Sequence, residues 1–311
     1  MSVLICGSFA YDNIMVFPDQ FKNHILPDKV HMLNVAFLVP ELRREFGGCA
    51  GNIAFNMKLL GDEPVPMGTV GSDFATYAAW MDKFSIIRRH VHVKDDHFTA
   101  QAYITTDIDD NQITAFHPGA MNLAHETKIT EAQNIKLGII APDGRDGMIQ
   151  HAQQFADAGI PFIFDPGQGL PMFDGEDLLQ FARQATYIAL NDYEAQLFED
   201  RTGLPPEEIA KLVEALIITR GAQGSHIYTE GKRIDIPCAK AEKVVDPTGC
   251  GDAYRAGLLH GILHGKDWEM TGRIASLLGA IKIEQHGTQN HQFTSQSFAE
   301  RFEQNFGMQL S

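Results

Sequence analysis

The stretch Asp246-Pro247-Thr248-Gly249-Cys250-Gly251-Asp252 opens an apolar helical run and combines the residue types that phosphoryl transfer needs. Glycines let backbone N–H groups converge on one point, and the N-terminus of a helix adds partial positive charge there. We therefore expect Gly249, Cys250 and Gly251 to form an anion hole. Asp252 stands beside them as a carboxylate that could take a proton from an attacking hydroxyl. The alternative is a capped helix start with no chemistry.

Two further segments carry candidate substrate contacts. The run Gly47-Gly48-Cys49-Ala50-Gly51-Asn52 precedes a long helical pattern, and its small residues allow close approach to the backbone. Asn52 offers both a donor and an acceptor. Asp12 follows the first apolar strand, and its carboxylate could accept two hydrogen bonds from a vicinal diol such as ribose presents. Each could also be an ordinary turn or loop residue.

Asn191 and Glu194 follow another strand and lie one helical turn apart, which suits holding a hydrated Mg²⁺ through waters. The same spacing is typical of a capping box, and the two roles can coexist. The run Thr219–Gly224 follows the next strand and has glycines for a tight turn at phosphate, or for a simple hairpin. It matches neither the P-loop nor the dinucleotide fingerprint. We see no paired metal-ligand spacing among the thirteen histidines.

The elements that must position these residues alternate between apolar strands and amphipathic helices. Strands are expected at 3–7, 137–140, 161–164, 187–190 and 216–219, and helices at 50–60, 148–158 and 175–185. This alternation predicts an α/β fold with a central, mostly parallel sheet and helices on both faces. In such sheets ligands bind beyond the carboxyl ends of the strands, where the candidate residues lie.

Segments 14–46 and 91–116 break this rhythm with short extended pieces, the second of them turning at Asp109-Asp110-Asn111. We predict that they form a small β-sheet lid, inserted in a large domain of residues 1–13, 47–90 and 117–311. A lid keeps water from a transferring phosphoryl group. Its exposed edges and face make a homodimer through the lid plausible.

Composition narrows the class of protein. The formal net charge of −15 and the absence of a basic cluster argue against a nucleic-acid partner. No apolar run approaches the length of a membrane span and no signal peptide is evident, so we expect a cytoplasmic protein with no membrane partner. The four cysteines are scattered, which disfavours a disulfide framework or metal cluster.

Taken together, the Gly7-Ser8…Asp12 opening and the runs GGCAGN, NDYE, TRGAQG and DPTGCGD resemble the ribokinase-like (PfkB) family of carbohydrate and nucleoside kinases. The resemblance covers nearly the whole chain. The segments FLVPELRREFGGCAGNIAFNMKLLG, ITAFHPGAM and VVDPTGCGDAYRAG are most similar to the bacterial adenosine kinases of that family. The resemblance implies a Rossmann-like body with a β lid and transfer of the ATP γ-phosphate to a hydroxymethyl group, with Mg²⁺ and often K⁺ as cofactors.

The resemblance also implies roles for individual residues. Asp252 would be the base, with the anion hole at Gly249, Cys250 and Gly251. The nucleoside side would comprise Ser8, Asp12, Gly48, Asn52, Phe116 (stacking on adenine) and Gln168. The ATP side would comprise Asn191, Thr219, Gly221 and Gly224, with Glu194 ordering Mg²⁺ through water and Asp246 nearest to K⁺.

Two positions depart from the pattern of the nearest relatives. Ala36 replaces an expected polar contact to the purine, and Met172 replaces an arginine near the reacting groups. The activity that the resemblance implies is phosphorylation of adenosine to AMP. A broad nucleoside kinase and a sugar kinase of the ribokinase or fructokinase type remain alternatives, and an aromatic platform at Phe116 would favour a nucleoside over a bare sugar.

Overall fold

The structure, a computed structural model, describes residues 2–25, 35–109 and 111–310. Within them, a nine-stranded sheet has the order β13-β12-β11-β10-β9-β8-β1-β4-β5. Its strands are β1 (Ser2–Cys6), β4 (Glu63–Gly71), β5 (His90–Lys94), β8 (Ile135–Ile140), β9 (Phe162–Phe164), β10 (Tyr187–Asn191), β11 (Ala215–Thr219), β12 (Ser225–Thr229) and β13 (Lys232–Ile236). Neighbouring strands from β5 to β11 run parallel, and β11-β12-β13 are antiparallel.

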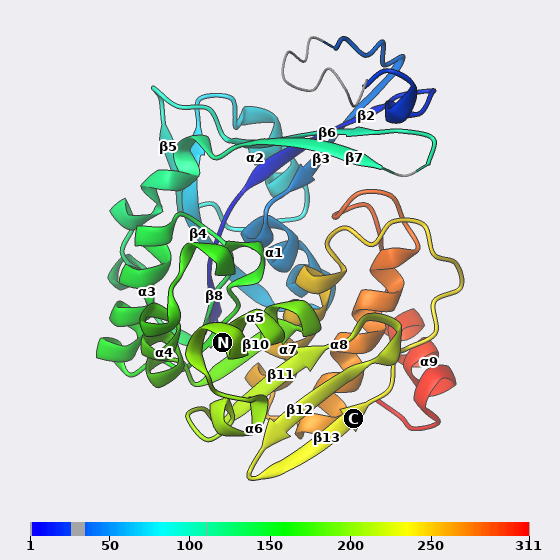
Figure 1. The fold of residues 1–311 in the computed structure, drawn as a ribbon. Coiled ribbons are helices and arrows are strands. Elements are labelled where there is room, and N and C mark those ends of the chain that lie inside the picture. Colours follow the sequence, from blue (N-terminus) through cyan, green and yellow to red (C-terminus); the bar gives the residue numbers. More distant parts are fainter. Residues whose placement is uncertain (1, 26–34, 110, 311) are drawn as a thin grey trace.

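Helices cover both faces of this sheet (Figure 1). On one face lie α1 (Cys49–Leu59), α2 (Ala75–Lys83), α7 (Cys250–Leu263), α8 (Trp268–Ile283) and α9 (Ser295–Phe306). On the other lie α3 (Arg145–Ala158), α4 (Gly175–Gln184), α5 (Asp192–Thr202) and the short α6 (Pro206–Ile209). Short 3-10 helices span Phe21–Asn23, Gly119–Glu126, Ile129–Glu131, Gly167–Met172 and Gly221–Gln223. The predicted α/β architecture is confirmed.

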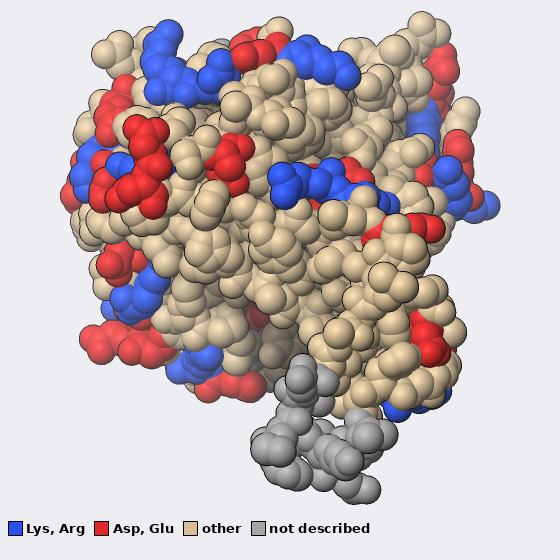
Figure 2. Space-filling model, turned by 90° about the horizontal axis from the view of Figure 1, so that it is seen from above, with Lys and Arg blue, Asp and Glu red and all other residues tan. Residues whose placement is uncertain are grey.

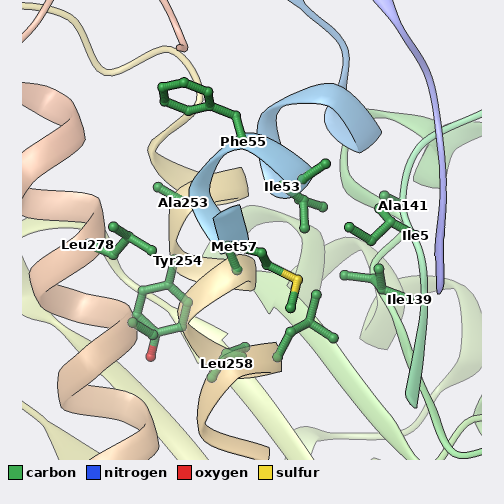
Figure 3. Packing of buried hydrophobic residues seen from close by; sticks show 14 of the residues in the cluster. Ile5, Ile53, Phe55, Met57, Ile139, Ala141, Ala253, Tyr254, Leu258 and Leu278 are labelled. Atoms are coloured by element: carbon green, nitrogen blue, oxygen red, sulfur yellow. The ribbon is translucent and has the colours of Figure 1, made fainter. Parts of the chain in front are cut away.

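The core on the first face joins the two helices that begin at candidate site residues. Ile53 and Met57 of α1 lie among Ala253 and Leu258 of α7 and Ile139 of the sheet (Figure 3). All five side chains are fully buried. Burying each of the four larger side chains, those of Ile, Leu and Met, stabilises the fold by about 1.5–3 kcal/mol. This packing fixes the starts of α1 and α7 relative to each other, at the carboxyl ends of the strands.

A second sheet of four strands, ordered β3-β2-β6-β7, lies over that end of the large sheet (Figure 1). It consists of β2 (Ala10–Val16), β3 (Glu41–Gly47), β6 (Ala100–Thr106) and β7 (Gln112–His117). Strands β6 and β7 pair antiparallel across the predicted turn, of which Asp110 lies outside the described residues. The small sheet expected from the sequence is present.

Its boundaries differ from the predicted ones. The small sheet begins at Ala10 rather than after residue 13, and it extends to Gly47. His90–Lys94, whose larger part we assigned to the lid, pairs parallel with β4 as the edge strand of the large sheet. A short strand with alternating apolar and polar residues fits the edge of either sheet, and only the pairing partner decides between them. Among the described residues, no helix is both long enough and apolar enough to cross a membrane.

Candidate active site

The turn that opens α7 has the geometry of an anion-binding site. Gly249 caps the helix in the left-handed region (φ +79°), and a Cβ there would lie 2.9 Å from Thr288 Cγ2. The Cys250 N–H donates to the Pro247 carbonyl at 3.1 Å, so it closes the turn instead of facing a ligand. Among the described residues, the N–H groups of Gly251 and Asp252 have no acceptor. Of the Gly249, Cys250 and Gly251 set expected to form an anion hole, the Cys250 N–H is therefore used by the turn itself.

Asp252 lies in the first turn of α7 and is mostly enclosed. Its Oδ2 accepts a hydrogen bond from Asn52 Nδ2 at 2.8 Å, across 200 residues of chain. Burial raises the pKa of Asp252 to about 6; the Asn52 hydrogen bond opposes the rise and the Asp165 carboxylate adds to it. A carboxylate with such a pKa is ionised at neutral pH and is still a usable proton acceptor.

The start of α1 brings Asn52 to this carboxylate. Gly48 has φ +84°, and a Cβ there would lie 2.5 Å from Phe9 Cα, so only glycine fits this close approach of chains. The Ser8 hydroxyl accepts from the Cys49 N–H at 3.2 Å, and the Ser8 carbonyl accepts from the Ala50 N–H at 2.9 Å. Ser8 therefore caps α1 from just after β1, and within the described part of the chain its own O–H has no acceptor.

Gln289 holds Asn52 in place, and sequence reasoning did not identify it. Its Nε2 donates to Asn52 Oδ1 at 3.0 Å, which leaves the Asn52 amide nitrogen directed at Asp252. The same Nε2 contacts Tyr77 Oη at 2.7 Å, and Gln289 Oε1 accepts from Trp80 Nε1 at 2.9 Å. Both residues belong to α2. No local motif marks Gln289, because its partners are distant in sequence.

Asp12 and Phe116 lie on one face of the small sheet. Asp12 pairs with Ala102 of β6, and Ala102 pairs with Phe116 of β7, so the three side chains share a row and a face. Asp12 and Phe116 are thus two strand spacings apart, about 10 Å. Phe116 is 52% exposed, so it is not a core residue. Burial raises the pKa of Asp12 to about 6, with contributions from Asp246 and Glu45.

Gln168 lies in the 3-10 helix that follows β9, and it points toward the same end of the sheet. Its Nε2 lies 3.7 Å from the Cys49 sulfur, beside the start of α1. Met172 ends the same 3-10 helix and is 41% exposed. Ala36 is exposed in the segment that leads into β3. Neither Ala36 nor Met172 carries a group that could replace the polar contact expected at its position.

Asn191 and Glu194 form the capping box that the sequence allowed. Asn191 Oδ1 accepts from the Glu194 N–H at 2.7 Å, and Glu194 Oε2 accepts from the Asn191 N–H at 2.8 Å. Asn191 Nδ2 also donates to Glu194 Oε1 at 2.7 Å. The pair is therefore rigid at the carboxyl end of β10. Carboxylate oxygens are ligands that Mg²⁺ accepts directly or through water, so the pair still fits a hydrated ion.

Arg255 connects this box to the base helix, and it is a second residue that sequence reasoning missed. It lies one turn after Asp252 on α7 and is 4% exposed. Its Nη2 lies 2.9 Å from Asp165 Oδ1 and 3.9 Å from Glu194 Oε2. These two carboxylates raise its pKa further, against the effect of burial. The buried guanidinium thus fixes α7 against the ends of β9 and β10.

Thr219 lies beside Asn191, because β10 and β11 pair in that register. Gly221 (φ +53°) and Gly224 (φ +83°) lie in the tight turn between β11 and β12. A Cβ at Gly224 would lie 2.0 Å from the Ile236 carbonyl oxygen, so the fold requires glycine at this position. A Cβ at Gly221 would point into open space. The run from Thr219 to Gly224 thus forms the hairpin turn that the sequence allowed. This turn lies at the same end of the sheet as the capping box.

The oxygens of Asp246, where a monovalent cation was expected, accept hydrogen bonds from neighbouring groups. Asp246 Oδ1 accepts from the Thr248 N–H and Oδ2 from the Gly287 N–H, both at 2.9 Å. The Asp246 carbonyl accepts from the Lys282 ammonium at 2.7 Å. These hydrogen bonds alone do not exclude K⁺, because an oxygen that accepts one hydrogen bond can still ligate a cation. The positive charge of Lys282 at the Asp246 carbonyl opposes a K⁺ ion at Asp246.

The view that the histidines lack paired spacing was wrong for His260 and His264. They lie one turn apart near the end of α7, and both contact the Asp62 carboxylate, at 2.7 and 2.8 Å. The three could hold a metal ion by geometry. Their evident structural effect is to tie the turn after α1 to α7, far along that helix from Asp252.

Comparison with known proteins agrees with this geometry. The family model of the pfkB family carbohydrate kinases matches residues 11–294. A nucleoside kinase of Methanocaldococcus jannaschii is 33% identical over 87% of this chain and 89% of its own length. The structure of Burkholderia thailandensis nucleoside kinase in complex with inosine is 53% identical, with a TM-score of 0.90 over 99% of both chains.

A second structure of the Burkholderia enzyme, in complex with ADP-inosine, is 55% identical with a TM-score of 0.88 and covers 99% of this chain and 97% of that one. The family match spans the small sheet almost completely, the large sheet from β4 onward and every candidate residue except Ser8. The protein is an enzyme that transfers a phosphoryl group to an alcohol, and it belongs to the pfkB family of carbohydrate kinases.

Proposed function

We propose that this enzyme is an ATP-dependent nucleoside kinase that phosphorylates the ribose 5′-hydroxyl of purine nucleosides, adenosine and inosine among them. The observation that carries the proposal is the shared row of Asp12 and Phe116 on one face of the small sheet. Asp12 would accept hydrogen bonds from the ribose hydroxyls, and Phe116 would stack on the base about 10 Å away. That span matches a nucleoside and exceeds a single sugar ring.

Breadth toward the base follows from the same residues. A stacking ring binds any flat base and does not read its edge. Ala36 adds no hydrogen-bonding group where a polar contact to the purine was expected. The Burkholderia relative, whose structure was determined with inosine, supports acceptance of a base other than adenine. We therefore favour a broad purine nucleoside kinase over a strict adenosine kinase.

In the proposed reaction, the 5′-hydroxyl donates its proton to Asp252 as its oxygen attacks the γ-phosphorus of ATP. The transition state is loose, so orientation and charge stabilisation matter more than strong basicity. Asn52 holds the Asp252 carboxylate at 2.8 Å, and Gly251 and Asp252 offer N–H groups for the developing charge. The proton moves to Asp252 as the bond from the γ-phosphorus to ADP breaks.

The ATP would lie along the ends of β10 and β11, bordered by Thr219, Gly221 and Gly224. Its Mg²⁺, which neutralises phosphate charge, would be ordered through waters by Glu194 and Asn191. Those two residues are held rigidly by their mutual hydrogen bonds and by the nearby Arg255.

The test is ADP release by the purified protein with Mg·ATP, across adenosine, inosine, guanosine, cytidine, ribose and fructose. Turnover of adenosine and inosine with little for the free sugars supports the proposal. Turnover of adenosine alone would leave a strict adenosine kinase. Turnover of sugars alone would keep the fold and the phosphoryl transfer but reject the base site.

We also propose a homodimer through the face of the small sheet opposite to Asp12. Leu42, Tyr103 and Ile113 share that face and are 66%, 43% and 43% exposed. Broad uncharged areas separate the charged side chains on the upper side of the molecule (Figure 2). Exposed apolar clusters of this kind are typical of interaction surfaces.

The double variant Leu42→Glu/Ile113→Glu should convert a dimer to a monomer in light scattering coupled to gel filtration. Val244→Glu, at a residue 76% exposed outside the small sheet, is the matched control and should leave the mass unchanged. A wild-type protein with the mass of one chain would reject the dimer.

A further inference from the structure

A buried ammonium lies directly behind the turn that forms the anion hole. Lys282, in the last turn of α8, has no solvent exposure. Its Nζ donates to the Asp246 carbonyl at 2.7 Å and to the Gln285 carbonyl at 3.3 Å. Lysine is almost never fully buried without such partners. Burial lowers the pKa of Lys282, and the neighbouring Asp246 raises it.

The ammonium is part of a fixed frame around the turn. The Gly287 N–H, from the loop that follows α8, donates to Asp246 Oδ2 at 2.9 Å. Thr288, next in that loop, lies against Gly249 and donates its hydroxyl to the Phe46 carbonyl. The segment from Lys282 to Thr288 thus holds both ends of the run from Asp246 to Gly249, from which α7 begins.

A monovalent cation bound in such a place would be coordinated by carbonyl and carboxylate oxygens. Here those oxygens already accept hydrogen bonds, two carbonyls from Lys282 and the Asp246 carboxylate from two backbone N–H groups. A second positive charge about 4 Å from the ammonium would cost on the order of 4 kcal/mol at the effective dielectric of a protein. The Lys282 ammonium therefore opposes the binding of a cation at these oxygens.

We propose that Lys282 supplies the fixed positive charge that other members of the family take from a monovalent cation, so that this kinase needs no K⁺. Lys282 is a positioning residue: it holds the Asp246 carbonyl and so orients the turn whose N–H groups face the transferred phosphoryl group. Its charge also adds to the positive potential at the start of α7. The inference rests on the proposed kinase function.

The first experiment titrates KCl into wild-type enzyme in a potassium-free, sodium-free buffer, with tetramethylammonium chloride keeping the ionic strength at about 0.1 M. We expect turnover with Mg·ATP and nucleoside to change by less than about twofold, and the melting temperature to show no K⁺-specific rise. A K⁺-specific stimulation of about tenfold or more would overturn the inference.

The second experiment compares Lys282→Ala with Lys282→Met. Both remove the charge, but methionine fills the space and alanine leaves room for a cation. We expect each to lower kcat about 10²- to 10³-fold, by analogy with loss of one donor from an oxyanion hole, and to leave KM for the nucleoside nearly unchanged. Only the alanine variant should recover activity with K⁺ or NH₄⁺. Full activity of Lys282→Ala without K⁺ would refute the role.

The melting temperature separates this inference from the proposed function. A K⁺-specific rise for Lys282→Ala, absent from Lys282→Met and from wild type, supports the shared position of ammonium and cation even if no tested nucleoside is phosphorylated. A K⁺-specific rise in wild type contradicts it. If neither variant folds, as judged by circular dichroism, the wild-type titration alone decides.

Discussion

Replacing Arg255 by methionine should destabilise the enzyme strongly, because it leaves a buried carboxylate without its partner. The Arg255 and Asp165 side chains are each 5% exposed, and Nη2 and Oδ1 lie 2.9 Å apart. At an effective dielectric of 20 this separation corresponds to about 6 kcal/mol of gross attraction. The cost of desolvation reduces the net value, and breaking one partner of a buried pair costs about 3–5 kcal/mol.

The effect should depend on pH. Burial raises the pKa of Asp165, and Arg255 opposes this rise. Without Arg255 the folded protein would bind a proton at Asp165 more tightly than the unfolded chain does. Stability is then retained near and below the unfolded pKa of about 4 and is lost as the pH rises through the folded pKa. Arg255→Met should therefore lower the free energy of unfolding more at pH 8 than at pH 5.

The assay is urea unfolding of wild type, Arg255→Met, Asp165→Asn and the double variant. The cycle should give a coupling free energy above about 1 kcal/mol, since the two groups are in contact. Arg88→Met is the control: Arg88 makes a bidentate pair with Asp82, at 2.7 and 2.9 Å, on the exposed surface, where loss costs below about 1 kcal/mol. An Arg255→Met penalty no larger than that of Arg88→Met, with no pH dependence, would refute the reasoning.

Two further predictions concern the reaction. Asp252→Asn should lower kcat about 10²- to 10⁴-fold with little change in the dissociation constant of the nucleoside, and near-normal turnover of the variant would remove Asp252 from the mechanism. In the wild-type enzyme, kcat/KM should fall as the pH drops through about 6, because Asp252 then takes up a proton. Phe116→Ala should raise KM for adenosine far more than for any free sugar that is turned over, because the base loses its stacking surface. Steady-state kinetics with adenosine and with a sugar measures both effects. Equal increases in KM for the two acceptors would reject stacking.

Local sequence was sufficient where a short segment builds its own geometry. The glycine-rich start of α7 and the capping box of Asn191 and Glu194 each depend on residues a few positions apart. Backbone conformation and helix capping are set by such neighbours. The alternation of strands and helices likewise predicted the parallel sheet and the edge at which the site lies, because helical connections between parallel strands bring their carboxyl ends together.

Contacts between distant segments could not be predicted in this way. The hydrogen bond from Asn52 to Asp252 joins residues 200 positions apart, and the hydrogen bond from Gln289 to Asn52 joins residues 237 positions apart. The assignment of His90–Lys94 to the large sheet also depended on its partner strand. No pattern in one segment specifies which remote side chain will meet it, since many packings satisfy the same local preferences.

The sequence by itself therefore determined the fold class, the glycine-rich turn at the start of α7 and the carboxylate that stands in it. Tertiary structure decided what surrounds them: the buried Arg255, the exposed face of Phe116 and the ammonium of Lys282 behind the turn. The physical reason is that backbone geometry is governed by neighbours in the chain. The charge and orientation of a site are governed by groups that become neighbours only when the core has packed.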